Sequence, residues 1–359
     1  MAWKLLELKP LKPFFFGGEK VFTNTHDAHS EYFPQQTQIL GALRLYWMEQ
    51  NRLIRVQKDG KYVPYEKKSE AINLVGDAGS SNFQHYDNLG CILGISPMFI
   101  LQKEKKCLKD ALFEIPSDVV SDRCNTTLAI PQKLNGIVSN KSVTLLKKFD
   151  TKKGFVSGFG GSAFWEDYCN DYASEAVVNF DKIYTAYEQV GIGLEHKQTV
   201  NKQFYTKKSY MLNDSYRFGL LINIDDEKLA KESQKTLQDG IISLGADASM
   251  FRLSVMDIPP SLKKHRLIAN LMNPPPQKGK KVVLLNDAML ESSIQEDAFF
   301  QIISKKIPFK TLQKKSHHKS KEKLLVPKGS VYYFDKPCSL PQAKGAYAKM
   351  GFNQYLVLN

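Results

Sequence analysis

The feature that most constrains the fold of this chain is the stretch from residue 190 to residue 225. There a glycine turn leads into a basic, aromatic segment and then into a strand, residues 216–225, whose alternating apolar side chains are typical of a half-buried β-strand. Between His196 and Arg217 the chain has five Lys or Arg residues and one acid, Asp214. Lysines neutralise phosphates and aromatic rings stack on unpaired bases, so the segment predicts an arm that grips single-stranded nucleic acid. The alternative is a solvated β-hairpin with ordinary surface lysines.

The charge balance favours an anionic partner. The 359 residues include 50 Lys and Arg against 37 Asp and Glu, and 50 − 37 gives a formal net charge of +13. This surplus favours nucleic acid first, an acidic protein second and a membrane surface third. The length predicts two domains and a core that needs no metal or disulfide to fold.

Several classes of protein are disfavoured by the motifs that are missing. The five cysteines are far apart and lack C-x-x-C spacing, which argues against a zinc site and against a secreted disulfide framework. Gly158-Phe-Gly-Gly161 is not followed by the Lys-Ser/Thr pair of a nucleotide-hydrolysing loop. No signal-peptide core and no apolar run of about 20 residues are present. We therefore expect a cytoplasmic protein without cofactors and without a membrane partner.

The first half of the chain begins with a strand, a loop and a helix. Residues 3–8 form the predicted strand, and apolar residues at helical spacing predict an amphipathic helix over 37–51. Residues 92–101 predict a strand with a bulge or bend at Gly94 and Pro97. The segments 55–90 and 103–175 have weaker periodicity and are expected to be insertions and loops.

The second half has a clearer pattern. After the strand 216–225, a stripe from Leu229 to Leu244 predicts a helix that Gly245 ends, and another strand follows at 251–255. A strand at 281–285, a helix at 292–303 and a strand at 329–334 complete the prediction. The expected fold is α+β, with two tandem ferredoxin-like (RRM-like) βαββαβ domains, 1–180 and 181–359, that carry loop and hairpin insertions.

The histidines leave a catalytic alternative open. His26 and His29 lie three residues apart, but a metal site would need further ligands that the sequence does not indicate. One of them could serve as the general base of a metal-independent ribonuclease. His265 lies among lysines and is expected to be solvated. The basic run 314–323 is expected to be a surface loop, with a phosphate-contacting loop as the alternative.

Several glycine-centred segments together resemble a known family. Phe33-Pro34 with Thr37-Gln-Ile-Leu-Gly-Ala-Leu-Arg44 resembles the F-P-x-x-T-x-x-G-A-L-R signature of RAMP proteins, the RNA-recognition subunits of CRISPR effectors. The segments 190–196, 244–249, 327–334 and 345–353 are similar, in the same order, to motifs of the third Cmr subunit. Ala246, Glu195 and Lys328 depart from that pattern.

The resemblance implies a non-catalytic RNA-binding subunit of a type III-B (Cmr) CRISPR ribonucleoprotein. Such subunits hold the 5′ handle of the guide RNA and contact the large polymerase-like subunit and the first backbone subunit. Glycine loops let an RNA backbone approach closely because no Cβ blocks it. The predicted RNA contacts are Arg44, Gly191, Gly193, His196, Lys197, Lys202, Tyr205, Lys207, Lys208, Arg217, Gly245, Arg252, Gly329, Ser330 and Gly351. The alternatives are a RAMP endoribonuclease that processes precursor guide RNA and a basic scaffold that binds only acidic proteins.

Overall fold

A computed structural model describes the chain in segments that together cover most of it. The described residues are 2–17, 20–22, 26–56, 62–64, 68–76, 88–105, 107–121, 126–133, 144–146, 154–174, 176–195, 198–231, 235–247, 249–274, 278–290, 297–309, 323–338 and 341–359.

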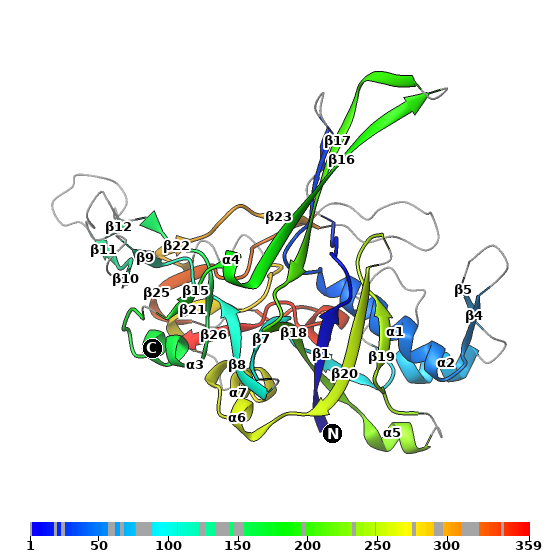
Figure 1. Cartoon of the computed structure of the whole chain (residues 1–359). Coiled ribbons are helices and arrows are strands. Elements are labelled where there is room, and N and C mark those ends of the chain that lie inside the picture. Colours follow the sequence, from blue (N-terminus) through cyan, green and yellow to red (C-terminus); the bar gives the residue numbers. More distant parts are fainter. Residues whose placement is uncertain are drawn as a thin grey trace.

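A nine-stranded sheet forms the centre of the molecule (Figure 1). Its order is β15-β14-β8-β7-β18-β1-β20-β19, and β6 also pairs with β18. These strands are β1 (Ala2–Pro10), β6 (Ile92–Ile95), β7 (Phe99–Glu104), β8 (Cys107–Glu114), β14 (Phe159–Gly160), β15 (Val177–Val178), β18 (Tyr216–Ile224), β19 (Gly240–Ser243) and β20 (Met250–Asp257).

Helices and a second sheet cover the two faces of the central sheet. The four-stranded second sheet has the order β22-β25-β21-β26. Its strands are β21 (Gly279–Leu284), β22 (Phe300–Ile302), β25 (Val331–Cys338) and β26 (Tyr355–Leu358). The helices are α1 (Gln36–Gln50), α2 (Lys68–Val75), α3 (Ser162–Cys169), α4 (Phe180–Ile183), α5 (Asp226–Lys231), α6 (Pro260–Lys263), α7 (Arg266–Met272) and α9 (Ala346–Lys349).

The remaining strands form smaller sheets. One sheet has the order β16-β17-β3-β2 and consists of β2 (Lys20–Phe22), β3 (His26–His29), β16 (Tyr184–Glu195) and β17 (Gln198–Leu212). The others are built from β4 (Ile54–Val56), β5 (Tyr62–Pro64), β9 (Val119–Ser121), β10 (Thr126–Leu128), β11 (Pro131–Lys133), β12 (Thr144–Leu146), β13 (Gly154–Phe155), β23 (Ile307–Phe309) and β24 (Lys323–Leu325).

The core has two layers because the middle strands are apolar on both faces. On one face Leu6 and Phe218 pack with Trp47 and the other buried side chains of α1. On the opposite face Leu5 and Leu221 belong to a second cluster with α3, α6, α7 and the inner side of the second sheet. A strand buried on both faces is a near-continuous apolar run, as Leu220-Leu221-Ile222 is in β18.

The structure confirms the α+β class and several of the predicted elements. The strands expected at 3–8, 216–225, 281–285 and 329–334 are β1, β18, β21 and β25, and the helix expected at 37–51 is α1. The bend expected within 92–101 separates β6 from β7.

The expected boundary at residue 180 does not divide the sheets. β1 pairs with β18 on one side and β20 on the other, so strands from both halves of the chain form one sheet. The second sheet, by contrast, draws only on residues from 279 onward. The two tandem ferredoxin-like domains therefore stay a prediction, since β1 lies between β18 and β20 and strands of both halves share one sheet.

Three local predictions were wrong. The helix expected up to Leu244 ends at Lys231, and residues 240–243 are the strand β19, in which exposed Ile241 alternates with buried Ile242. Residues 300–302, expected to be helical, form β22. The segment 103–175 is more than loops, because β8 and α3 contribute Phe113 and Trp165 to the core.

Candidate nucleic-acid interface

A long two-stranded arm projects from the body of the molecule (Figure 1). It consists of β16 and β17, paired antiparallel from Tyr184↔Leu212 to Glu195↔Gln198. Residues 185–190 of β16 are all exposed, so both faces of that strand meet solvent. The predicted hairpin is thus confirmed, and it begins twelve residues before the segment 196–210 in which it was expected.

The two arm lysines whose side chains the structure describes, Lys207 and Lys208, each lie near an acid. Lys207 forms an ion pair with Asp247 and lies over the ring of Phe15 at 5.1 Å. Lys208 lies 3.7 Å from Glu188 on the neighbouring strand. Of the other predicted contacts, Gly191 and Gly193 are in β16, and Lys202 and Tyr205 are in β17. The side chains of Lys202 and Tyr205 lie outside the described part of the structure, and so do all atoms of residues 196–197.

Aromatic packing fixes the base of the arm. The ring of Tyr32 lies 4.7 Å from Tyr184 and 4.6 Å from Tyr210, one on each strand of the arm, and 4.6 Å from Phe180. Burial, together with the hydrogen bond to Tyr210, raises the pKa of Tyr32 to about 12. Tyr32 therefore stays neutral at physiological pH, and the packed rings form the support from which the arm extends.

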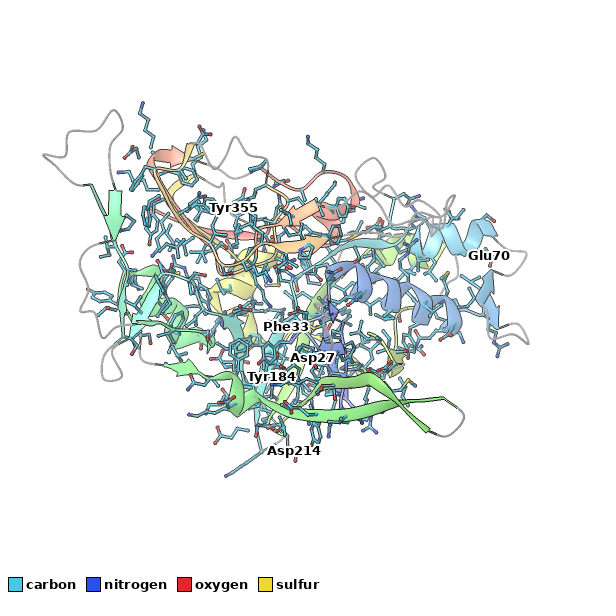
Figure 2. The ribbon with its side chains drawn as sticks, turned by 90° about the horizontal axis from the view of Figure 1, so that it is seen from above. Asp27, Phe33, Glu70, Tyr184, Asp214 and Tyr355 are labelled. Atoms are coloured by element: carbon cyan, nitrogen blue, oxygen red, sulfur yellow. The ribbon has the colours of Figure 1, made fainter. Side chains whose placement is uncertain are left out.

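A cleft of about 590 Å³ opens beside this support. Tyr32, Phe33 and Phe180 contribute an aromatic wall, while Lys305, Lys306 and Lys328 supply positive charge. Figure 2 places Phe33 between Tyr184 at the base of the arm and Tyr355 in the second sheet. The cleft is also lined by Phe16, Gly17, Glu31, Pro34, Gln35, Gln36, Gln38, Met98, Glu114, Asn286, Asp287, Ser304, Ile307, Pro308 and Pro327.

The charges in the cleft are arranged around Lys328. Its Nζ lies 3.0 Å from Glu114 Oε2 and 3.5 Å from the centre of the Phe33 ring. Its backbone N–H donates to Asp287 Oδ1 at 3.1 Å, and burial raises the pKa of Asp287. Lys305 and Lys306 are exposed, so the positive charge open to solvent lies at these two residues.

Three glycine loops with left-handed backbone border the cleft. Gly245 has φ +90° and packs on Phe16, Gly329 has φ +80° and follows Lys328, and Gly351 has φ +82°. Asn286, which lines the cleft, donates from Nδ2 to the carbonyl of Gly351 at 2.7 Å. Three of the glycine segments named in the sequence analysis therefore lie next to residues that line the cleft, whereas the fourth, with Gly191 and Gly193, lies in the arm. Their association with RNA stays a prediction.

Close packing explains why these positions are glycine. A Cβ on Gly245 would lie 2.7 Å from the carbonyl oxygen of Phe15, and one on Gly351 would lie 2.6 Å from that of Ile95. Ser330, next to Gly329, is fully buried, and its hydroxyl donates to Pro327 at 2.7 Å to close the turn. These contacts are internal to the protein and shape the cleft.

The three predicted arginine contacts lie away from the cleft. Arg44 is buried, and its guanidinium donates to the carbonyl of Gly76 at 2.9 Å, just after α2. Arg217 and Arg252 alternate with Phe218 and Phe251, whose rings lie 5.8 Å from Phe16. They therefore project from the opposite face of the central sheet, and the geometry gives none of the three a place in the cleft.

The histidines in the described segments do not assemble into a metal or catalytic centre. β3 pairs in parallel with β17, which sets His26 beside Tyr205 and His29 beside Lys208. Among the described residues no group of three or more His, Cys, Asp or Glu side chains could hold a metal ion. His265 was expected to be solvated, but it is 3 % exposed and caps α7, with Nδ1 accepting from Leu267 N–H.

Sequence reasoning missed the residues on the C-terminal side of the cleft. Lys305 and Lys306 form a dibasic pair that could have been noticed, yet nothing local shows that it reaches the cleft. Phe33 was assigned to a motif and not to a site. The basic run 314–323 lies outside the described residues.

Comparison with known proteins identifies the family. The model of the family described as CRISPR-associated protein (Cas_Cmr3) matches residues 6–359. The chain belongs to this family. No protein with a curated description matches it significantly.

The solved structures that this Cas_Cmr3 chain resembles are remote in sequence. A chain of the type III-B Cmr-beta complex bound to cognate target RNA is 12 % identical, with a TM-score of 0.49, over 92 % of this chain and 86 % of that chain. A chain of a Csm3–Csm4 subcomplex of the type III-A CRISPR–Cas interference complex is 12 % identical, with a TM-score of 0.45, over 99 % of each chain. The family assignment therefore rests on the sequence match. Within the described residues, no helix is long and apolar enough to cross a membrane.

Proposed function

We propose that this protein is a non-catalytic, cytoplasmic RNA-binding subunit of a type III-B (Cmr) CRISPR ribonucleoprotein and holds the 5′ handle of the guide RNA. The observation that carries the proposal is the continuity of the arm with the cleft. Tyr32 packs on both strands of the arm and also lines the cleft. A single strand that follows the arm would therefore arrive at an aromatic wall bordered by three glycine loops.

The chemistry of the cleft suits unpaired RNA. Lys328 covers one face of the Phe33 ring, so the aromatic wall offers a base its remaining exposed ring surface, and the exposed Lys305 and Lys306 offer phosphate contacts. The volume of about 590 Å³ suits a short stretch of nucleotides rather than a duplex. In this proposal the protein partners are the large polymerase-like subunit and the first backbone subunit. Within the chain, two ferredoxin-like units contribute strands to the shared central sheet.

The test is a binding and crosslinking experiment with labelled guide RNA. We expect the complex that contains this chain to bind the guide without cutting it, and crosslinks from the first nucleotides to reach the glycine loops and the arm. Replacing Lys305 and Lys306 by Ala should weaken binding, whereas Lys263→Ala with Lys264→Ala, two exposed lysines elsewhere, should not.

Other outcomes select the other functions. Cleavage of precursor guide RNA without metal would support an endoribonuclease, and absence of RNA binding would support a scaffold for acidic proteins. Crosslinks confined to residues 314–323 would contradict the placement in the cleft.

A further inference from the structure

One part of the central sheet has an open face whose composition differs from that of the cleft. The register sets Lys9 opposite Arg252 and Arg252 opposite Ile241. In the next row Leu11 N–H donates to Met250 at 2.9 Å, and Met250 pairs with Ser243. Paired residues of an antiparallel sheet project from the same side. These six side chains therefore form one patch, which we call the β19 face: Lys9, Leu11, Ile241, Ser243, Met250 and Arg252.

The β19 face is exposed although it is partly apolar. Leu11 is 43 % exposed, Ile241 is 52 % exposed and Met250 is 37 % exposed. Farther along the same face, Leu5 and Leu221 are completely buried in the cluster that includes α6, α7 and the second sheet. The cover of the sheet thus ends before β19, and three neighbouring aliphatic side chains are left in solvent.

The β19 face is also positively charged. Within the described residues, no carboxylate pairs with Lys9 or Arg252. Two acids, Glu7 and Asp239, lie one row away on the same face. The Glu7 carboxylate already lies 2.6 Å from Lys103 and 3.8 Å from Arg217, and Asp239 Oδ1 accepts a hydrogen bond from the Val255 N–H at 2.7 Å. The two cations that flank the aliphatic residues are therefore available to carboxylates from outside the chain.

The geometry points to a docking site for another protein, one whose surface presents carboxylates around an aliphatic centre. The β19 face has no aromatic ring on which an RNA base could stack. Aliphatic side chains beside Met and Arg are typical of the buried centre of a protein interface. Arg252, predicted from the sequence as an RNA contact, is thereby assigned to a protein partner. The site is separate from the cleft, since Arg252 and Phe251 project from opposite faces.

The test uses the complex purified through a tag on this chain and a carbodiimide, which joins a lysine amine directly to a carboxylate. We expect Lys9 to be coupled to an Asp or Glu of a co-purifying subunit. In the complex, acetylation of Lys9 should fall at least fivefold relative to the free chain. The double variants Lys9→Glu/Arg252→Glu and Ile241→Asp/Met250→Asp should each lower recovery of that subunit at least tenfold.

Controls separate docking from folding and from RNA binding. Lys263→Glu/Lys264→Glu carries the same charge change on exposed lysines, and Leu324→Asp changes an aliphatic side chain that is 57 % exposed; both should keep the subunit. The β19-face variants should melt like the wild type and bind guide RNA normally, so loss of the subunit cannot be confused with failure of the RNA site. Three results would overturn the inference. They are equal acetylation of Lys9 in the free chain and in the complex, recovery of this chain with no co-purifying protein, and RNA crosslinks at Met250.

Discussion

The cleft and the arm differ in how their polar groups are used. Around the cleft, internal hydrogen bonds already occupy groups such as the Ser330 hydroxyl and the Asn286 amide. Along the arm, residues 185–190 are exposed on both faces, and the ion pair between Lys208 and Glu188 is long, at 3.7 Å. A substitution in the body near the cleft should therefore change the free energy of unfolding, whereas one on the arm should mainly change affinity for a ligand.

The largest effect on stability is expected at Asp118, in the body of the molecule. Its carboxylate is fully buried and accepts hydrogen bonds from Tyr168 and Tyr333, and it lies 2.9 Å from Lys281 Nζ. Asp118→Asn leaves the buried Lys281 ammonium without its counter-charge, which should cost about 3–5 kcal/mol. Urea denaturation would measure this loss. Asp214→Asn, at an exposed position, should change stability by less than about 0.5 kcal/mol.

Two of the glycine loops test the contrast between stability and binding, because a Cβ would have less space at Gly245 than at Gly329. Gly245→Val would place a branched side chain at φ +90° and 2.7 Å from a backbone oxygen, which should cost about 2–3 kcal/mol. A Cβ on Gly329 would lie 3.1 Å from its nearest neighbour, the Ile115 carbonyl oxygen, so Gly329→Val should cost less stability than Gly245→Val. Its main effect should therefore be on RNA binding. Melting and guide-binding curves of both variants would test this order. Equal losses of stability would contradict it.

Changing the arm should affect binding without affecting folding. Replacing Lys197, Lys202, Lys207 and Lys208 by Ala should weaken guide binding and reduce the slope of log affinity against log salt. For single strands each lost phosphate contact lowers that slope by about 0.7, so the expected change is about 2 to 3. Titrations at several salt concentrations measure it. An unchanged slope would show that these lysines make no phosphate contacts with the guide RNA.

A smaller effect of pH is expected from His265. Burial lowers the pKa of this imidazole below its ordinary 6.5, despite the nearby Asp110 carboxylate. The unfolded chain therefore binds more protons than the folded chain just below pH 6.5, and stability should fall as the pH drops through that range. His265→Asn keeps a capping side chain and should flatten this dependence between pH 7 and pH 5 in urea denaturation. A wild-type curve that is already flat would contradict the assignment.

The smallest effect is expected for the histidines that could have been catalytic. Replacing His26, His29 and His196 by Ala should leave guide processing and target cleavage by the assembled complex unchanged. The measurement is product formation by complexes with matched subunit content. Normal assembly with unprocessed guide RNA would instead favour the endoribonuclease.

The sequence predicted elements whose signal is local and missed those that depend on distant partners. β1, α1 and the arm follow from periodicity and turn residues within a few residues of each element. β19 was mistaken for part of a helix because Leu237, Ile241 and Leu244 also fit a helical stripe. The central sheet could not be foreseen, since the β1–β18 pairing joins residues more than 200 positions apart. For the same reason Lys305 and Lys306 could not be foreseen at the cleft, since only the tertiary fold brings them there.

The pairing of β1 has a consequence for the order in which the protein is made. Pro10 pairs with Phe251, and 251 − 10 is 241 residues, which take about 12–50 s to synthesise at ~5–20 residues per second. Until residue 216 is made, the first strand of the chain, with Leu5 and Leu6 on opposite faces, has neither of its final neighbours, and it lacks β20 for the whole interval. The nascent protein must keep this strand from pairing with other chains. A message truncated before residue 216 would yield a product whose first strand never acquires either neighbour.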